Sequence, residues 1–205
     1  LFAQQIASED DGREVMRRWM DIEEIISYAV VDRTIRNDDG AFHWYCSTDE
    51  ANYGSDCGNH NFYWYSNPST GKVHLIPWDL DNAFENILFD ANPVTPIADK
   101  WGETSNGCKG FAYGEWYLPQ RSAACDKITY IWSTFEEEYE RIHNEFLQGP
   151  FAKEQVDLLL DAWEQQISPV VKEAAEIHDD ALRFEDWQEA LDGFRRSLGH
   201  ARSIK

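Results

Sequence analysis

The sequence has few basic residues compared with acidic ones. Its 205 residues include 18 Lys and Arg against 38 Asp and Glu, which gives a formal net charge of −20 at pH 7. No local run of Lys or Arg offsets this excess. Non-specific nucleic-acid binding needs such cations to displace counterions from phosphates. We therefore exclude nucleic acid as a partner.

Long apolar runs are also missing. None approaches the roughly 20 residues needed to span a bilayer, which argues against membrane insertion. The chain starts at Leu1 without an initiator Met or a signal-peptide pattern, which predicts an internal piece of a longer protein. Hydrophobic residues make up 42% and aromatic residues 14% of the chain, enough for a folded core and too much for a disordered chain.

No pair of cysteines has the C-x-x-C spacing of a zinc or redox site. Cys46, Cys57, Cys108 and Cys125 lie in polar, loop-like segments. An even number of cysteines in such segments favours disulfides and an exported protein. Of the three possible pairings we favour Cys46–Cys57 and Cys108–Cys125, with four reduced thiols as the alternative.

Periodicity predicts a mostly helical α+β domain with one β-hairpin. A capping-box pattern at Asp21–Glu24 precedes a helix. Further expected segments are a loop over 37–60, a hairpin over 61–79, a long functional loop over 86–125 and a helical subdomain over 126–205.

In the helical subdomain, apolar residues recur at steps of three and four. They predict one helix from Ile128 to Phe146, a helix that breaks or kinks at Pro169, and a last helix around Trp187–Ala201. We interpret these apolar stripes as core.

Acidic and amide side chains gather around the hairpin. Asn61 begins its first strand, and Asp79 and Asp81 follow its second. Because a hairpin brings its two outer ends together, we expect Asn61 and Asp79 to face each other. Oxygen ligands without Cys or His suit Mg²⁺, Mn²⁺ or Ca²⁺. An equally tenable interpretation is that Asp79 caps a turn and Asp81 is a turn residue.

Residues 61–84 resemble the signature of the CotH (spore-coat protein H) kinase family. Asn61-Phe-Tyr-Trp-Tyr65, a Gly-containing turn, and Ile76-Pro-Trp-Asp-Leu-Asp81 ending at Phe84 correspond to its N-Y-Y-x-Y and I-P-W-D-x-D-x-x-F elements. Arg36-Asn-Asp-Asp-Gly40 resembles its N-x-D-G element. The resemblance covers roughly residues 21–85 and implies an atypical protein-kinase-like fold, of which residues 1–205 would be the helical C-terminal lobe.

The resemblance also implies ATP and Mg²⁺ (or Mn²⁺) as cofactors and a protein as substrate. Asp79 would hold metal against the phosphates, Asp81 would be a second metal contact, and Asn61 would bind the second metal. Asp39 matches the N-x-D-G aspartate and is the favoured base. Asp56 is the rival, because it precedes Asn61 by the D-x-x-x-x-N spacing of ordinary kinases. Asp38 is expected to be a solvated turn acid.

The sequence lacks the G-x-G-x-x-G loop of a kinase small lobe. We therefore expect the isolated fragment to be inactive and the full-length parent to be an exported, envelope- or coat-associated bacterial kinase. Segment 86–125 would bind substrate, with candidates Trp101, Lys109, Phe111, Tyr113 and Trp116. The alternatives are a pseudokinase or structural coat or adhesion module, and an extracellular Ca²⁺-stabilised binding domain.

Overall fold

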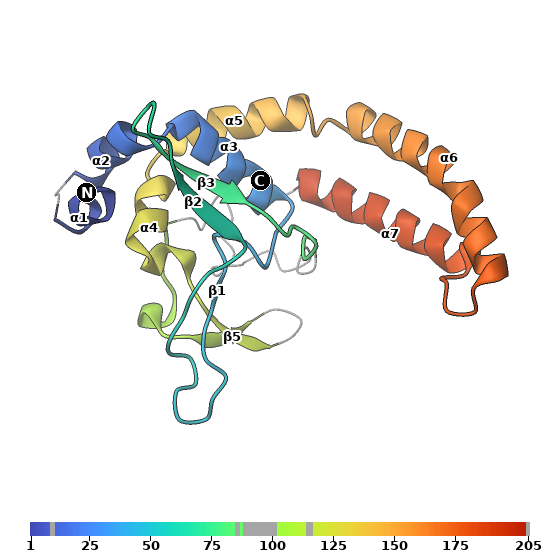
Figure 1. Cartoon of the computed structure of the whole chain (residues 1–205), viewed down its shortest axis with the longest axis horizontal. Coiled ribbons are helices and arrows are strands. Elements are labelled where there is room, and N and C mark those ends of the chain that lie inside the picture. The colour runs from blue at the N-terminus through green and yellow to red at the C-terminus, as the bar shows by residue number, and fades with distance from the viewer. Residues whose placement is uncertain (9–10, 85–86, 88–101, 114–116, 204–205) are drawn as a thin grey trace. The chain divides into compact units, whose positions relative to one another are not determined.

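The computed structural model describes residues 1–8, 11–84, 87, 102–113 and 117–203. They form mostly helices with two small antiparallel sheets, which confirms the α+β prediction (Figure 1). The chain divides into two compact units, residues 1–143 and 144–204. Within the described residues, no helix is long and apolar enough to cross a membrane.

The first unit contains helices and both sheets. Its elements are α1 (Phe2–Ser8), α2 (Gly12–Trp19), α3 (Ile22–Thr34), β1 (Trp44–Tyr45), β2 (Phe62–Ser66), β3 (Val73–Pro77), β4 (Phe111–Tyr113), β5 (Leu118–Arg121) and α4 (Lys127–Ser133). Short 3-10 turns cover Asn106–Cys108 and Ala123–Cys125. The first sheet has the order β1-β5-β4, and the second is the β2-β3 hairpin.

Helix α3 forms much of the core of this unit. Asp21 caps it, because the Asp21 Oδ1 accepts a hydrogen bond from the Glu24 backbone N–H at 3.3 Å. Its apolar residues Ile26 and Val30 are fully buried. Phe42 is also fully buried and lies between aromatic rings, stacked on Tyr28 and edge-on to Trp132. The loop after α3 is thereby anchored in the core.

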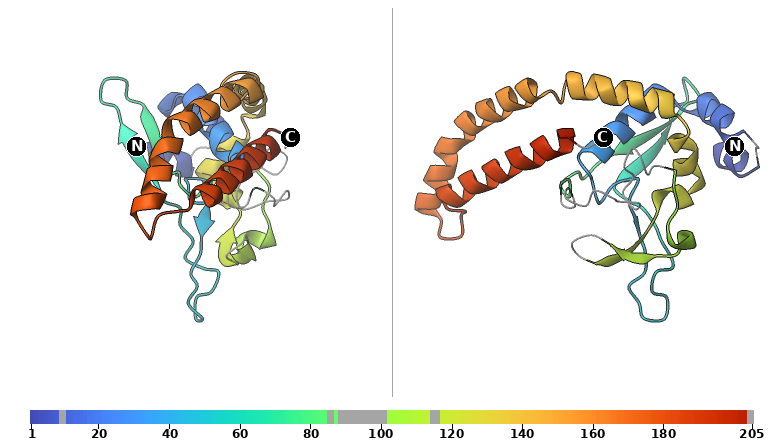
Figure 2. Two further views of the ribbon diagram at one scale, coloured as in Figure 1. Left: turned by 90° about the vertical axis from the view of Figure 1, so that its right-hand side faces the viewer. Right: turned by 180° about the vertical axis from the view of Figure 1, so that it is seen from behind.

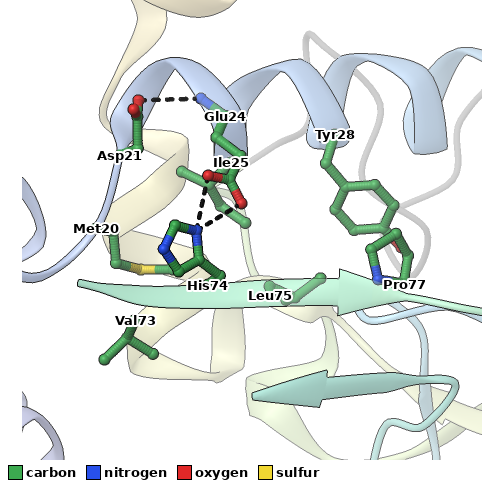
Figure 3. Close-up of a pocket in the computed structure, with 9 residues that line it drawn as sticks. All are labelled: Met20, Asp21, Glu24, Ile25, Tyr28, Val73, His74, Leu75 and Pro77. Atoms are coloured by element: carbon green, nitrogen blue, oxygen red, sulfur yellow. Dashed lines mark hydrogen bonds and ion pairs between the residues drawn. The ribbon is translucent and has the colours of Figure 1, made fainter. Parts of the chain in front are cut away.

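The hairpin is fixed against α3 by polar contacts. The His74 Nδ1 on β3 contacts both carboxylate oxygens of Glu24, at 2.9 and 3.0 Å, and the two residues line a cavity of about 170 Å³ together with Tyr28 (Figure 3). The Lys72 ammonium donates to the backbone carbonyls of Arg17 at 2.8 Å and Met20 at 3.0 Å. These contacts hold the hairpin near its turn, at the opposite end from the Phe62–Pro77 pair.

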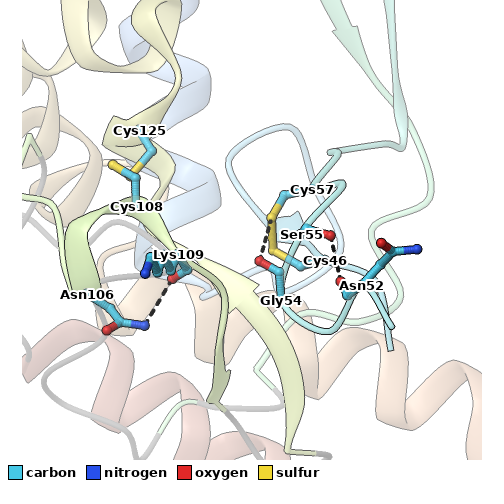
Figure 4. The surroundings of a disulfide bond; sticks show 9 residues. All are labelled: Cys46, Asn52, Gly54, Ser55, Cys57, Asn106, Cys108, Lys109 and Cys125. Atoms are coloured by element: carbon cyan, nitrogen blue, oxygen red, sulfur yellow. Dashed lines mark hydrogen bonds between the residues drawn. A yellow bond between two sulfur atoms is a disulfide. The ribbon is translucent and has the colours of Figure 1, made fainter. Parts of the chain in front are cut away.

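Both predicted disulfides, Cys46–Cys57 and Cys108–Cys125, are present (Figure 4). They close two loops that touch each other, because the Gly110 N–H donates to the Gly54 carbonyl at 2.9 Å. A Cβ atom on Gly110 would come within 2.6 Å of the Gly54 Cα, so this approach requires glycine.

Three predictions of secondary structure were wrong in detail. The expected loop over 86–125 contains β4 and β5 in its described residues. The expected loop over 37–60 contains β1, which pairs with β5 far along the chain and bridges Tyr45 to Gly58. The expected helix over 128–146 is two helices, α4 and α5 (Glu136–Gln148). They separate because the Phe135 N–H bonds to the Trp132 carbonyl, three residues back, which tightens the last turn.

The second unit consists mainly of α6 (Lys153–Ile177) and α7 (Phe184–Ser203), which run side by side (Figure 2). Arg195 on α7 binds Asp161 at 2.7 Å and Glu164 at 3.0 Å on α6. Helix α6 continues through Pro169 without ending. The expectation that its apolar stripe is core was wrong, because Trp163 is 52% and Val170 is 63% exposed.

Candidate active site

The loop between α3 and β1 places Asp39 by a chain of short-range bonds. Asn37 is fully buried, and its Nδ2 donates to the Asp32 Oδ1 at 2.9 Å. Its Oδ1 accepts from the Asp39 backbone N–H at 3.3 Å. A Cβ atom on Gly40 would lie 2.4 Å from the Asn37 Nδ2 and 2.9 Å from the Asp32 Oδ1. This geometry explains why the loop combines Asn37, Asp39 and Gly40.

Three side chains converge on the Asp39 carboxylate. The Asn61 Nδ2 donates to the Asp39 Oδ2 at 2.8 Å and also to the Asp39 backbone carbonyl at 2.8 Å. The Asn82 Nδ2 donates to the same Oδ2 at 3.1 Å. The His60 Nε2 contacts the other oxygen, Oδ1. Asp39 is therefore the centre of a cluster drawn from the two ends of the hairpin and the preceding loop.

Asp79 and Asp81 lie in the same cluster. The pKa of the Asp79 carboxyl is raised, first by desolvation and then by the negative charge of Asp81 and a hydrogen bond to it. The charge of Asp39 adds to this rise, while His60 opposes it. The carboxylates of Asp81 and Asp39 thus act electrostatically on Asp79, an arrangement that favours a bound cation.

The backbone at the open end of the hairpin is unusual. Asn61 has φ of 59° and Asp79 has φ of 58°, in the left-handed region that residues other than glycine seldom adopt. The Trp78 N–H donates to the Asn61 carbonyl at 3.0 Å, so Asn61 lies opposite Trp78 and Asp79 follows one residue later. Such conformations cluster at functional sites, where neighbouring contacts hold them.

The structure brings four of the five candidate residues together. Asn61 donates to Asp39, and both Asp81 and Asp39 act electrostatically on the Asp79 carboxyl. Asp56 does not join them: it is exposed in the Cys46–Cys57 loop, and no hydrogen bond or ion pair links it to the cluster in the described part of the chain. The D-x-x-x-x-N spacing alone therefore does not bring Asp56 to Asn61.

The expectation for Asp38 was wrong. Asp38 is 1% exposed rather than solvated, and its Oδ1 lies 3.5 Å from the Nδ1 of the fully buried His43. Burial lowers the pKa of His43 to about 3; a hydrogen bond with Gln120 opposes this shift, and the electrostatic effect of His60 adds to it. His43 is therefore neutral, and its contact with Asp38 is a polar contact rather than an ion pair. The Tyr45 hydroxyl also donates to the Asp38 backbone carbonyl, at 3.0 Å.

Sequence reasoning missed the part that Asn82 takes. No pattern in the sequence marks this residue, because its position depends on how the loop packs against the hairpin. Of the substrate candidates, Lys109 is exposed, while Phe111 and Tyr113 are half-buried on β4. Trp101 and Trp116 lie outside the described residues.

The donor set fits a hard divalent cation in part. Asn61 uses its Nδ2 for Asp39, so its Oδ1 has no hydrogen-bond donor among the described residues and is available as a ligand. Carboxylate and amide oxygens are the ligands that Mg²⁺ prefers. In the described part of the chain, no three His, Cys, Asp or Glu side chains converge to hold a metal alone. Phosphate oxygens would have to complete the coordination, as is usual for Mg²⁺ in nucleotide sites.

An exposed hairpin end with clustered oxygen donors defines this region as a candidate metal and phosphate site. The CotH kinase protein family model matches residues 2–197, which is nearly the whole chain. The protein belongs to the CotH kinase family, which confirms the resemblance found in the sequence. No curated protein and no solved structure matches the chain significantly.

Proposed function

We propose that the protein takes part in ATP- and Mg²⁺-dependent phosphoryl transfer to hydroxyl groups of proteins, with residues 1–205 as the C-terminal lobe. The observation that carries this proposal is the convergence of Asp39, Asn61, Asp79 and Asp81 from separate segments of the chain. Membership in a kinase family supports it.

In this proposal Asp79 and Asp81 supply carboxylate oxygens on one side of the site, and Asn61 supplies its Oδ1. Mg²⁺, when bound, neutralises charge on the β- and γ-phosphates and so favours transfer of the γ-phosphoryl group. Desolvation raises the pKa of Asp79 most, and the negative charges of Asp81 and Asp39 add to the rise, which supports a cation at this place. Binding of a metal nucleotide would remove that repulsion.

Asp39 is the proposed base. Its carboxylate is held by Asn61, Asn82 and His60, so its orientation is set before a substrate arrives. It would accept a hydrogen bond from the attacking hydroxyl and orient it toward the γ-phosphorus. Asp56 is not proposed for this step, because it is exposed and has no hydrogen bond or ion pair to the cluster among the described residues.

We further propose that the protein works outside the cytoplasm or in a coat. Two disulfides cross-link adjacent loops of the first unit. Structural disulfides persist in oxidising compartments and are rare in the cytosol.

The test uses the full-length protein with γ-labelled ATP and Mg²⁺ or Mn²⁺, and follows label on protein. Asp79→Asn should abolish labelling, and Asp39→Asn should lower its rate by several orders of magnitude. Asp56→Asn should leave the rate within twofold of the wild type. An Asp79→Asn protein that transfers phosphate at the wild-type rate would refute the site assignment.

Two other results would redirect the proposal. A wild type that neither transfers label nor binds nucleotide would favour a pseudokinase or a structural coat module. A wild type that is stabilised by Ca²⁺ without nucleotide, through Asp79, would favour a Ca²⁺-stabilised binding domain, because such sites do not need phosphate ligands.

A further inference from the structure

Asn82 makes two separate bonds to the loop that carries Asp39. Its side-chain Nδ2 donates to the Asp39 Oδ2 at 3.1 Å. Its backbone carbonyl accepts from the Asp38 N–H at 3.3 Å. It is half-buried and lies next to Asp81. One residue thus connects the segment of the proposed metal ligands with the loop of the proposed base.

The connection extends beyond Asn82. Two residues later, the Phe84 N–H donates to the Ile35 carbonyl at 2.8 Å. The segment 82–84 therefore runs along the segment 35–38 with a backbone bond at each end. Arg36 in this segment is fixed as well, because its Nη1 donates to the Ile87 carbonyl at 2.7 Å. The backbone that carries the Asn82 side chain is consequently already held in place.

The chemistry of an amide suits this position. Asp39, Asp79 and Asp81 are all acceptors when ionised, and each repels the others. A neutral donor next to Asp39 can hold its Oδ2 without adding charge to the cluster. An Asp at position 82 would instead place a fourth carboxylate against Asp39, with no proton to donate at neutral pH.

We propose that Asn82 is a positioning residue that orients the Asp39 carboxylate toward the acceptor hydroxyl. The inference rests on the proposed phosphotransferase function and deepens it. Asn82 and Asn61 donate to the same oxygen, Oδ2, while His60 contacts Oδ1. Asn82 therefore restricts rotation of the carboxylate, and it acts on the reaction only through Asp39.

The first experiment measures kcat and KM for the magnesium nucleotide in the full-length protein. Asn82→Ala should lower kcat by about 10- to 100-fold, the usual effect of removing a residue that orients a functional group. The KM for nucleotide should change by less than about threefold, because Asp39 is not proposed as a metal ligand. Asn82→Asp should lower kcat further. Asn52→Ala is the matched control, since Asn52 is exposed on the disulfide loop (Figure 4).

A double-mutant cycle separates positioning from general destabilisation. If Asn82 acts through Asp39, adding Asn82→Ala to Asp39→Asn should lower the remaining rate by less than about threefold. A loss of the same size in both backgrounds would overturn the proposal.

A readout that does not need activity distinguishes failure of this inference from failure of the proposed function. Backbone hydrogen exchange of residues 36–40 should become several-fold faster in Asn82→Ala and stay unchanged in Asn52→Ala. An inactive wild type would refute the proposed phosphotransferase function. Hydrogen exchange of residues 36–40 would then still measure whether Asn82 holds the loop that carries Asp39. Unchanged exchange, or an unchanged kcat in an active protein, would overturn the role of Asn82.

Discussion

Replacing the buried Asp32 by asparagine should change how stability depends on pH. Asp32 is 1% exposed, and its Oδ1 accepts from the Tyr28 hydroxyl and the Asn37 Nδ2, both at 2.9 Å. Its Oδ2 is buried and has no hydrogen-bond partner among the residues that the structure describes. Burial raises the pKa of Asp32 to about 7, although the bonds from Asn37 and Tyr28 and the charge of Arg33 oppose the rise.

The sign of the effect follows from linkage. A carboxyl whose pKa is raised by folding stabilises the folded state below its unfolded pKa of about 3.9, and this contribution is lost as pH rises to about 7. His43 has the opposite effect, because its pKa is lowered to about 3. Its contribution is present above an unfolded pKa of about 6.5 and is lost as pH falls. Between about pH 4 and 6.5 the two slopes oppose each other.

Asp32→Asn keeps an oxygen for the two donors and removes the titration. The free energy of unfolding of the variant, relative to the wild type, should therefore rise by roughly 2–3 kcal/mol between pH 5 and pH 8, at about 1.4 kcal/mol per unit of pKa shift. Urea unfolding at pH 5, 6, 7 and 8 measures this difference. The control is Asp49→Asn, an exposed site. A difference between Asp32→Asn and wild type that stays constant from pH 5 to pH 8 would refute the argument.

Two further predictions concern the scaffold of the site. Gly40→Ala should destabilise the protein by about 1–3 kcal/mol, because its Cβ would overlap the Asn37 amide. The control Gly58→Ala should be nearly neutral, since no described atom lies within 4 Å of its Cβ. Equal urea unfolding midpoints for the two variants would contradict this prediction. Replacing Cys46 and Cys57 by serine should cost about 3 kcal/mol, because the disulfide closes a loop of sequence separation 11. The melting temperature checks this second prediction, and an unchanged value would show that the open loop is already ordered.

Local signals in the sequence predicted the parts of the fold that local chemistry determines. The cap at Asp21 and the two strands of the hairpin are set by side chains within a few residues, and the structure has both. The disulfide pairing was also predictable, since the first cysteine bonds the second and the third bonds the fourth.

Features that depend on contacts between distant segments could not be predicted in the same way. The pairing of β1 with β5 joins residues more than 70 positions apart, and nothing near Trp44 indicates its partner. Likewise, the periodicity of α6 showed an amphipathic helix but not how much of the stripe is covered. Periodicity identifies a face, whereas burial depends on what packs against it.

The candidate site was predictable as a set of residue types and only partly as a geometry. Hairpin topology placed Asn61 near Asp79, and the family pattern added Asp39. Our preference for Asp39 over Asp56 rests on contacts that the sequence does not reveal: Asn61 and Asn82 bond the Asp39 carboxylate, whereas Asp56 is exposed in the Cys46–Cys57 loop. Asn82 emerged only from the packing of segment 82–84 against segment 35–38.

The central claim is that Asn61, Asp79 and Asp81 hold a metal nucleotide. Its most direct test is a titration of the full-length protein with Mn²⁺ in the presence of ATP, with bound metal counted by electron paramagnetic resonance. The wild type and Asp49→Asn should bind Mn²⁺ in an ATP-dependent manner, and Asp79→Asn should lose that binding. Equal ATP-dependent binding of Mn²⁺ by wild type and Asp79→Asn would contradict the account.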